Sequence, residues 1–270
     1  MIKASIIISF YNNLYALEKI LIALENQNDG SFEAIISDDG SNQESIDEIK
    51  TYSDRFSFPI QHIWHEDKGF RKNRILNKSV IAAKNEYLIF IDADCVPQAH
   101  FVADHLQNAQ KNTTLSGRRA DISQKISEKI NNEHPELFFK RNFWSILLDY
   151  LLGNGKNIEK GIRVSNSFIS KQLNKKEKGI VGCNFSLFKK DILKINGFDE
   201  RYEGAGIGED SDVEFRLKLA GIQVKNLFYL ANQIHIYHEE LPRPCHNHEL
   251  FSQVKKLKQA YTPFGIKKTQ

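Results

Sequence analysis

Cysteine is scarce in this sequence. The three cysteines, Cys95, Cys183 and Cys245, are odd in number, lie far apart and include no CxxC pair. This spacing argues against a disulfide framework and against a zinc knuckle, because both need paired thiols. It is the pattern expected of a protein from a reducing compartment.

Long apolar runs are also missing. A strand-like apolar segment begins at Ser5, which leaves no room ahead of it for a signal peptide. The longest later apolar patch, residues 143–152, is interrupted by Asp149 and is too short to span a bilayer. We therefore expect a cytoplasmic protein that is at most peripherally attached to the inner face of a membrane.

Neither sign of charge is in large excess. The formal net charge of +3 gives no indication of a nucleic-acid partner. Basic residues do gather over residues 171–178 and 255–268. Most such runs are solvated faces, and the second interpretation is attraction to an anionic membrane surface or an anionic glycan.

Apolar, β-prone runs alternate with helical patterns along the chain. This alternation predicts an α/β fold, an open and mostly parallel twisted sheet with helices on both faces. The predicted strands cover residues 4–10, 32–37, 59–64, 87–91, 180–188, 223–230 and 233–238. The predicted helices cover residues 14–24, 45–52, the later part of 68–84, 100–112, 123–131, 136–152, 190–196 and 210–220.

The predicted strand over residues 87–91 ends in two carboxylates, Asp92 and Asp94, one residue apart. Ligands of open α/β sheets gather at the carboxyl ends of the strands. A divalent cation with a phosphate-bearing ligand would relieve the repulsion between these two like charges. The alternative is that both aspartates cap the following turn and helix.

A second predicted strand ends in Asp38-Asp39-Gly40-Ser41. A carboxylate there can accept hydrogen bonds from a base or from ribose hydroxyls, or it can simply form an Asp-Gly turn. A basic cluster follows between this strand end and residue 87. It contains Lys68, Arg71, Lys72 and Arg74, and it suits a diphosphate or, alternatively, a solvated helix face.

The stretch from Gly204 to Asp212 contains three glycines and three acidic residues. It is not a dinucleotide loop, because no predicted strand precedes it. Glu209 and Asp210 are expected to open a helix, where the helix dipole favours a carboxylate. The alternative is that these carboxylates only cap the N-terminus of the helix and do not belong to a binding site.

Histidines gather near the end of the last predicted strand. His235 and His238 are three residues apart, so a strand over residues 233–238 would direct them to opposite faces, and at most one would join a site easily. A mixed histidine and carboxylate set suits manganese better than magnesium. His246 and His248 could form a separate site, which is the weaker hypothesis.

The order of these motifs resembles that of family-2 glycosyltransferases of the GT-A fold. The resemblance lies in residues 5–12, 38–41 and 84–94, whose last stretch is similar to the family's DxD motif. Residues 182–186 and 197–212 resemble the C-terminal segment of β-1,4-galactosyltransferases. Bacterial chondroitin polymerase domains join both halves, and they share Gly69-Phe70-Arg71 and a stretch like residues 238–242. The resemblance leaves out roughly residues 118–178.

The resemblance implies one GT-A domain with a nucleotide-sugar-binding half over residues 1–95, an acceptor and catalytic half over 96–240 and a helical tail over 241–270. It implies that Asp210 is the base and that Glu209 binds sugar hydroxyls. Many relatives have an arginine where this chain has Leu76, so Arg71 or Arg74 would supply the charge at the diphosphate. The other implied site residues are Ser9, Phe10 and Tyr11 beside the nucleoside, Asp39 on uracil, Asp92 and Ala93 toward ribose or metal, and Asp94 and His238 on Mn²⁺ or Mg²⁺.

These expectations describe an inverting, metal-dependent transfer of a hexosyl or N-acetylhexosaminyl group from a UDP-sugar to a glycan or lipid-linked glycan, in bacterial surface polysaccharide or lipopolysaccharide synthesis. A non-catalytic nucleotide-sugar or glycan-binding module remains the alternative. A nucleotidyltransferase fits less well, because no Gly-rich, basic loop follows the first strand. The aromatic and basic segment over residues 136–144 is expected to be a buried helix face rather than a helix that binds a membrane or an acceptor.

Overall fold

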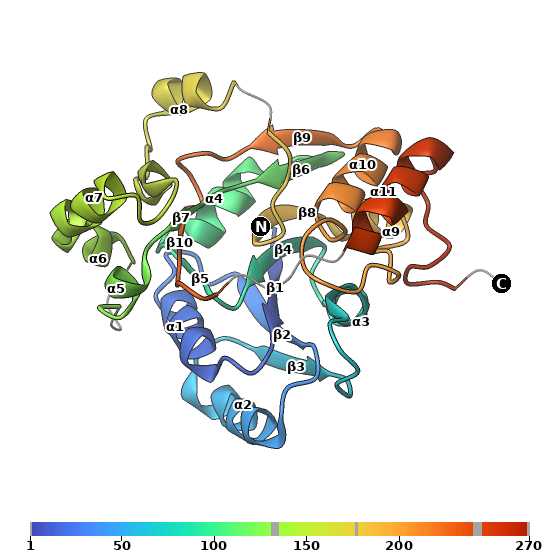
Figure 1. Ribbon diagram of the computed structural model, residues 1–270, viewed down its shortest axis with the longest axis horizontal. Coiled ribbons are helices and arrows are strands. Elements are labelled where there is room, and N and C mark those ends of the chain that lie inside the picture. The colour runs from blue at the N-terminus through green and yellow to red at the C-terminus, as the bar shows by residue number, and fades with distance from the viewer. Residues whose placement is uncertain (1, 131–134, 176–177, 240–244, 269–270) are drawn as a thin grey trace.

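The computed structural model describes residues 2–130, 135–175, 178–239 and 245–268. Its main feature is a seven-stranded sheet with the strand order β3-β2-β1-β4-β8-β6-β9 (Figure 1). In this order the strands are Ile60–Trp64, Phe32–Asp38, Ala4–Phe10, Tyr87–Asp92, Asn184–Phe188, Thr113–Ser116 and Gln223–Asn226.

Strands β3, β2, β1 and β4 are all parallel, and β8 is antiparallel to both β4 and β6. The chain runs from β1 outward to β2 and β3 and then returns to place β4 on the other side of β1. The strand order therefore reverses at the β1–β4 pair, where open α/β sheets bind ligands. The predicted mostly parallel α/β sheet is confirmed.

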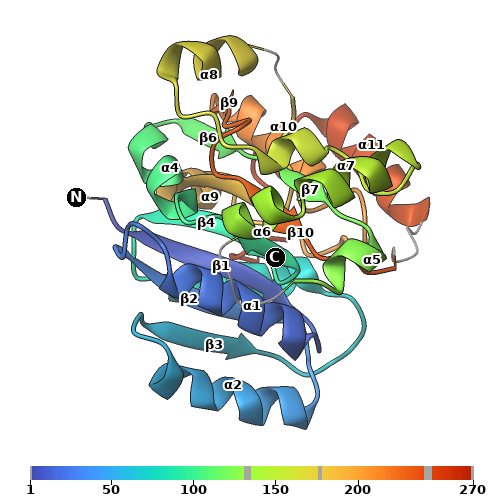
Figure 2. The same cartoon turned by 90° about the vertical axis from the view of Figure 1, so that its left-hand side faces the viewer.

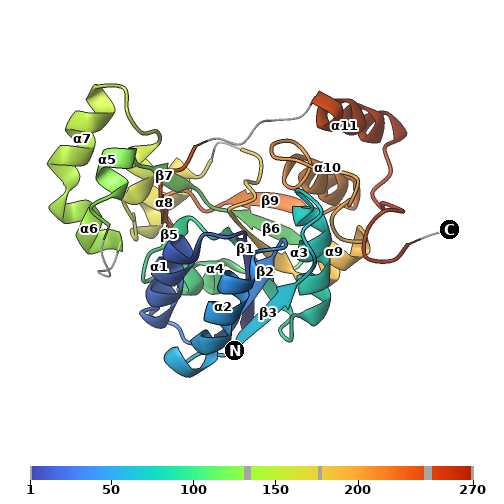
Figure 3. The same cartoon turned by 60° about the horizontal axis from the view of Figure 1, so that its bottom comes forward.

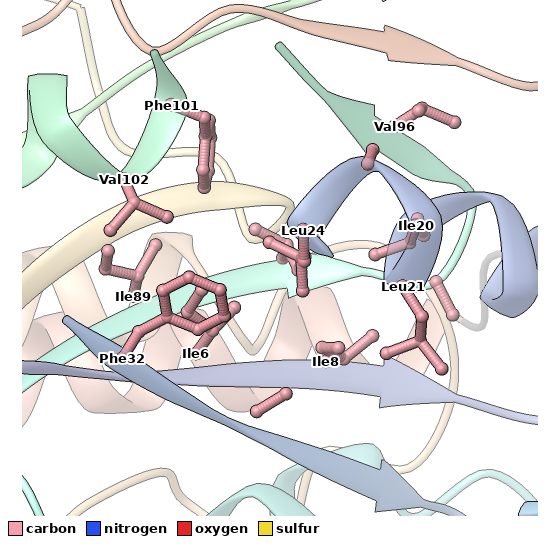
Figure 4. Packing of buried hydrophobic residues seen from close by; sticks show 14 of the residues in the cluster. Ile6, Ile8, Ile20, Leu21, Leu24, Phe32, Ile89, Val96, Phe101 and Val102 are labelled. Atoms are coloured by element: carbon pink, nitrogen blue, oxygen red, sulfur yellow. The ribbon is translucent and has the colours of Figure 1, made fainter. Parts of the chain in front are cut away.

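Helices cover both faces of the sheet because successive residues of the buried strands point to opposite sides. Ile6 and Ile8 of β1 pack with helices α1, α2 and α4 on one face, and Figure 4 shows their packing with residues of α1 and α4. Ile7 packs with α3, α9 and α10 on the other face. On this second face the rings of Phe90 and Phe185, from neighbouring strands, stack with their centroids 4.5 Å apart.

The helices have the following bounds: α1 Leu14–Glu25, α2 Gln43–Arg55, α3 Lys72–Ala82, α4 Phe101–Asn108, α5 Gln124–Ser127, α6 Pro135–Arg141, α7 Phe143–Leu151, the 3₁₀ helix η1 Ile158–Gly161, α8 Ser167–Leu173, α9 Lys189–Lys194, α10 Ser211–Leu219 and α11 Cys245–Leu257.

A second, three-stranded sheet consists of β5, β10 and β7, which are Cys95–Pro97, Gln233–His235 and Arg119–Asp121. Helices α5, α6 and α7 pack beside it around a separate apolar cluster that includes Phe138, Phe139 and Ile146. Figure 3 shows these helices gathered at one end of the molecule, opposite α10 and α11, and Figure 2 shows the molecule from the end on which they lie. In the described part of the chain, none of the helices has the length and apolar character that crossing a membrane requires.

Several predicted elements differ from the structure. The strands expected over residues 180–188 and 233–238 are shorter, because regular pairing begins at Asn184 and ends at His235. The strand expected over 223–230 ends at Asn226, because Tyr229 and Ala231 adopt left-handed backbone conformations that turn the chain. The helix expected over 136–152 is two helices that meet at Asn142. Strands β5, β6 and β7 were not predicted.

Candidate active site

The parallel strands bring the polar strand ends to one edge of the sheet. Ser9 is in register with Asp92, and Phe10 is in register with Asp38. The turns beyond the strands are linked as well, since the N–H of Ala93 donates to the carbonyl of Ser9 over 2.9 Å. Residues that are distant in the sequence therefore line one edge.

The two aspartates after β2 have different surroundings. Asp38 holds the turn, because its Oδ1 accepts from the N–H of Ser41 over 2.8 Å. Asp39 accepts a 2.7 Å bond from Nε2 of His65 and a 2.8 Å bond from the N–H of Arg71. Burial raises the pKa of Asp39, although these two hydrogen bonds oppose the rise. The sequence reasoning missed His65, whose only signal was its place just before the basic cluster.

The loop after β1 divides into a buried and an exposed part. The ring of Phe10 is 3% exposed and lies in the core, so its side chain is not available to flank a nucleoside as predicted. The side chain of Tyr11 is 52% exposed, and its hydroxyl donates to Oδ2 of Asp67 over 3.1 Å. Gly40 is required beside this loop, because its φ is +100° and a Cβ there would lie 2.6 Å from Cα of Asp67.

Asp94, His235 and His238 form a cluster with the composition of a metal site. One ligand atom from each residue lies within 4.8 Å of the other two. Nε2 of His238 lies 3.0 Å from Oδ2 of Asp94, and Nε2 of His235 lies 3.6 Å from the same oxygen. The prediction that at most one histidine would join was wrong, because the strand ends at His235 and the alternation of side chains ends with it.

The surroundings of this cluster fit a divalent cation. Nε2 of His235 is buried without a hydrogen-bond partner, while its Nδ1 lies 3.0 Å from Oδ1 of Asp121. A carboxylate on the far nitrogen is the usual way to orient a metal-binding imidazole. Burial would raise the pKa of Asp94, but the two histidines hold it well below its usual range. Burial would lower the pKa of His235, but Asp121 and Asp94 raise it to about 9.

Lys72 connects Asp92, the neighbour of Asp94 at the end of β4, to Glu209 in the glycine-rich stretch over residues 204–212. Its Nζ lies 2.6 Å from Oδ1 of Asp92 and 2.6 Å from Oε2 of Glu209, and its side chain is only 14% exposed. Burial raises the pKa of Glu209 to about 7, with Lys72 opposing the rise. Burial would lower the pKa of Lys72, but the two carboxylates raise it. Lys72 thus remains charged between them.

Asp210 lies at the N-terminus of α10. Its Oδ1 accepts from the N–H of Ser211 over 2.6 Å and from the Ser211 hydroxyl over 3.0 Å. The helix dipole stabilises a negative charge at this position. Asp212, by contrast, is fully buried, and its Oδ2 accepts a 2.7 Å bond from Nε of Arg216. Asp212 therefore holds the helix in the core.

One open pocket of about 1360 Å³ joins several of these groups, although Asp39, Lys72 and Asp94 are not among the residues that line it. Asp92, Glu209, Asp210, His235 and His238 line it. It is also lined by residues from the segment without recognisable motifs, among them Arg118, Arg119 and Asp121. The sequence reasoning missed them, since no periodic pattern marks the short strand β7 on which Arg119 and Asp121 lie.

The predicted diphosphate-binding arginines are already engaged. Nη2 of Arg71 donates to the carbonyl of Glu66, while its Nε is buried without a partner. Nε of Arg74 lies 3.1 Å from Oε2 of Glu200. Of the described basic cluster, Lys72 is the member that contacts the acidic strand end.

Comparison with known proteins identifies the family. The model of "Glycosyl transferase family 2" matches residues 5–194, and the model described as "N-terminal domain of galactosyltransferase" matches residues 163–239. The chain belongs to glycosyl transferase family 2. This agrees with the resemblance to bacterial chondroitin polymerases, because chondroitin synthases are among the similar proteins.

Curated relatives of this glycosyltransferase are distant and longer. The glycosyltransferase YfnE of Bacillus subtilis is 27% identical, and the match covers 90% of this chain and 66% of that protein. The chondroitin synthase of Pasteurella multocida is 25% identical, with 89% of this chain and 25% of that protein covered. The chain therefore spans less than two thirds of the curated relatives it matches.

Solved structures share the GT-A fold. Staphylococcus aureus TarS superimposes with a TM-score of 0.58 at 15% identity, over 95% of this chain and 39% of that one. The structure of GalNAc-T7 with UDP, GalNAc and Mn²⁺ gives a TM-score of 0.57 at 15% identity, over 94% of this chain and 48% of that one. At this identity the likeness supports the fold.

Proposed function

We propose that this glycosyltransferase moves a hexosyl or N-acetylhexosaminyl group from a UDP-sugar to a hydroxyl of a glycan, with inversion and with a divalent cation. The observation that carries the proposal is the shared pocket: two histidines of the Asp94 cluster, Asp92 and the helix-capping Asp210 all line it. A donor diphosphate and an acceptor hydroxyl need such groups within one cavity.

The donor would occupy the carboxyl edge of β1, β2 and β4. In this proposal Asp39 accepts from uracil, Ser9 and Tyr11 flank the nucleoside, and Asp92 with Ala93 lies toward ribose. The exposed ring of Tyr11 and the hydrogen-bonding oxygens of Asp39 are suited to these roles. A relative of the same fold, TarS, has been crystallised with UDP-GlcNAc, which supports a UDP-sugar donor.

Asp94, His235 and His238 would hold the cation. Their mixed oxygen and nitrogen set favours Mn²⁺ over Mg²⁺. A bound cation would supply Lewis-acid stabilisation of the charge that develops on the diphosphate. Asp121 would keep the His235 ring in position through its 3.0 Å contact with Nδ1. Arg71, whose Nε has no partner, would add positive charge from the other side.

Asp210 would act as the general base. In this step the acceptor oxygen attacks the anomeric carbon, the bond from that carbon to the diphosphate oxygen breaks, and the acceptor proton passes to Asp210. Attack from the face opposite the departing UDP inverts the anomeric configuration. Lys72 would hold Glu209 beside this position, where Glu209 can bind sugar hydroxyls.

The acceptor is proposed to be a glycan or lipid-linked glycan of bacterial surface polysaccharide or lipopolysaccharide synthesis. Similar proteins include chondroitin synthases and a transferase whose name specifies an undecaprenol-linked acceptor. We keep the division into a donor half over residues 1–95, an acceptor half over 96–240 and a helical tail over 241–270. The 240/241 boundary and the motif residues Glu240, Leu241 and Pro242 lie outside the described residues.

A peripheral position at the cytoplasmic side of a membrane completes the proposal. The segment over residues 136–144 was expected to be buried, and Phe138 and Phe139 are, but Trp144 is 73% exposed. Trp144 begins a stripe that continues on α7 with Leu148 and Leu151 and ends just beyond the helix at Leu152; these three leucines are 61%, 70% and 80% exposed. Large apolar side chains on one helix face, with Lys140 and Arg141 just before them, suit an anionic lipid surface.

A panel of UDP-sugars with Mn²⁺ tests the proposed function. We expect UDP release with at least one sugar, and loss of release when a chelator removes the metal. UDP binding without any turnover, with every sugar and with added acceptors, would favour the non-catalytic binding module instead.

A further inference from the structure

Three cations that line the pocket surround the rings of Phe228 and Tyr229. The guanidinium carbon of Arg118 lies 4.5 Å from the centroid of Phe228, and Nζ of Lys178 lies 5.8 Å from it. Nζ of Lys160 lies 5.1 Å from the same centroid and 4.0 Å from that of Tyr229. All three cations line the pocket that Asp210 also lines.

Hydrogen bonds and burial hold these rings and cations in place. Asn174 clamps the backbone of Phe228, accepting from its N–H over 2.6 Å and donating from Nδ2 to its carbonyl over 3.0 Å. Arg118 donates to the carbonyls of Gly117 and Gly179 over 2.7 and 2.8 Å. The side chain of Lys160 is 10% exposed, so its ammonium group is held at the pocket wall and not free in solvent.

Among the described residues the three cations have little compensation at ion-pair distance, although Glu214 and Asp210 act on Arg118 through their charge. Over residues 2–130, 135–175, 178–239 and 245–268, the carboxylate within ion-pair range of the three cations is Glu159, whose Oε1 lies 3.5 Å from Nζ of Lys160. That glutamate side chain is 49% exposed, so the pair is weak.

The better-placed carboxylates of the pocket have other partners. Asp92 and Glu209 bind Lys72, and Asp121 contacts Arg119 and His235. Three like charges around one ring repel one another unless an anion joins them.

The cluster also lies near the proposed base. Burial lowers the pKa of Arg118, and the charges of nearby carboxylates, Glu214 and Asp210, oppose this shift. An anion held by the cluster would therefore lie in the same pocket as the oxygen that takes the acceptor proton.

We propose that Arg118, Lys160 and Lys178 form a subsite for an anionic group of the acceptor, a carboxylate or a phosphate. The two lysines donate hydrogen bonds to the anion, while Arg118, whose N–H groups largely bind carbonyls, contributes charge. The acceptor is then an acidic glycan whose charged unit is anchored here while a hydroxyl points to Asp210. This assignment rests on the proposed function, because it gives one wall of the same pocket to the acceptor.

Titration calorimetry with defined oligosaccharides tests the subsite. The probes are an unsulfated tetrasaccharide of glucuronate and N-acetylgalactosamine, its carboxyl methyl ester and a glycerol phosphate tetramer, each added in the presence of UDP and Mn²⁺. Hydrogen bonds to a charged group are worth enough to predict at least about tenfold tighter binding of one anionic probe than of the neutral ester. The tighter of the two anionic probes identifies the group as carboxylate or phosphate.

Substitutions localise the effect. Lys160→Met is expected to remove the preference for the anionic probe and to leave the affinities for UDP and for the neutral ester unchanged. Lys178→Met, at an exposed position, gives a second test if Lys160→Met folds poorly. Lys50→Met is the control, because Lys50 lies on α2 with a 64% exposed side chain and does not line the pocket.

The outcomes separate the two proposals. Failure of the wild-type protein to bind UDP would overturn the proposed function. Normal UDP binding with equal affinities for charged and neutral probes, or an equal loss in Lys50→Met and Lys160→Met, would overturn the anionic subsite alone.

Discussion

Asp92 and Asp94 are one residue apart but make contacts with different partners. Asp92 contacts the ammonium group of Lys72, whereas Asp94 contacts the imidazoles of His235 and His238. A buried carboxylate needs a cationic partner or a metal, and each aspartate has a separate one. The two side chains should therefore respond differently to substitution.

Asp94→Ala is predicted to abolish metal-dependent UDP binding. The variant removes the oxygen that both histidines approach, so Mn²⁺ affinity should fall by more than the roughly 10–100-fold expected for Asp121→Asn, which perturbs only the orientation of His235. Calorimetry with Mn²⁺ and UDP measures both losses, and Asp47→Ala on the exposed face of α2 is the control. Unchanged Mn²⁺-dependent UDP binding in Asp94→Ala would remove Asp94 from the ligand set.

Asp210→Asn is predicted to retain UDP binding and to lose transfer. The amide oxygen can still accept from the N–H of Ser211, so the start of α10 is preserved, but it cannot take a proton. We expect kcat to fall by about 10²–10⁴-fold, the usual contribution of a general base. Glu44→Gln, in the first turn of α2, should leave kcat unchanged. Turnover of Asp210→Asn close to that of the wild type would exclude Asp210 as the base.

At the scale of whole elements, the first half of the fold was predictable and the pocket wall was not. Strands β1 and β4 are buried on both faces, so their apolar runs are continuous and easily recognised. The wall contains short elements that were not predicted, among them β7 and η1, whose apolar residues Ala120 and Ile158 join their cluster only through tertiary contacts. Such contacts leave no hydrophobic periodicity in the local sequence, so these elements were missed, and Arg118 and Lys160 were missed with them.

In the site, too, the features that depend on tertiary contacts could not be predicted from the sequence. Asp92, Asp94 and Asp210 could be located because each adjoins the end of a predicted element. The joint approach of His235 and His238 to Asp94 could not, because it depends on where β10 ends, and strand ends are set by pairing partners.

Helix α10 depends on a buried ion pair that also supports the N-terminal position of Asp210. Asp212 and Arg216 are 0% and 1% exposed, and Nη1 of Arg216 also donates to the carbonyls of Ile195 and Gly197 over 2.9 Å each. Arg216→Met is predicted to lower the free energy of unfolding by about 3–5 kcal/mol, because it leaves the Asp212 charge buried and unpaired. Urea denaturation measures the loss.

The same helix supplies the control. Lys218 pairs with Glu214 at the same spacing of four residues, but its side chain is 55% exposed. Lys218→Met should cost less than about 1 kcal/mol. Equal losses in the two variants would show that burial does not make the Asp212–Arg216 pair contribute more to stability than an exposed pair does.

At the scale of the whole molecule, the apolar stripe of α7 is close in sequence to residues that line the pocket. Asp149 on the same helix and Gly153 and Asn154 just beyond it line the pocket. A membrane that covers Trp144 and Leu148 would bring a lipid-linked acceptor to the pocket opening. In this proposal, membrane contact and substrate delivery are therefore linked.

Vesicle co-sedimentation tests this link. The protein should bind vesicles rich in phosphatidylglycerol more tightly than vesicles of phosphatidylcholine, because Lys140 and Arg141 precede the stripe. Trp144→Ser with Leu148→Ser should weaken binding at least about tenfold, since each large side chain contributes roughly 1.5–3 kcal/mol on burial. Ile81→Ser, at a 58% exposed position on α3, is the control. Unchanged vesicle binding in the double variant, or a dimer in solution that it dissociates, would instead identify the stripe as a protein interface.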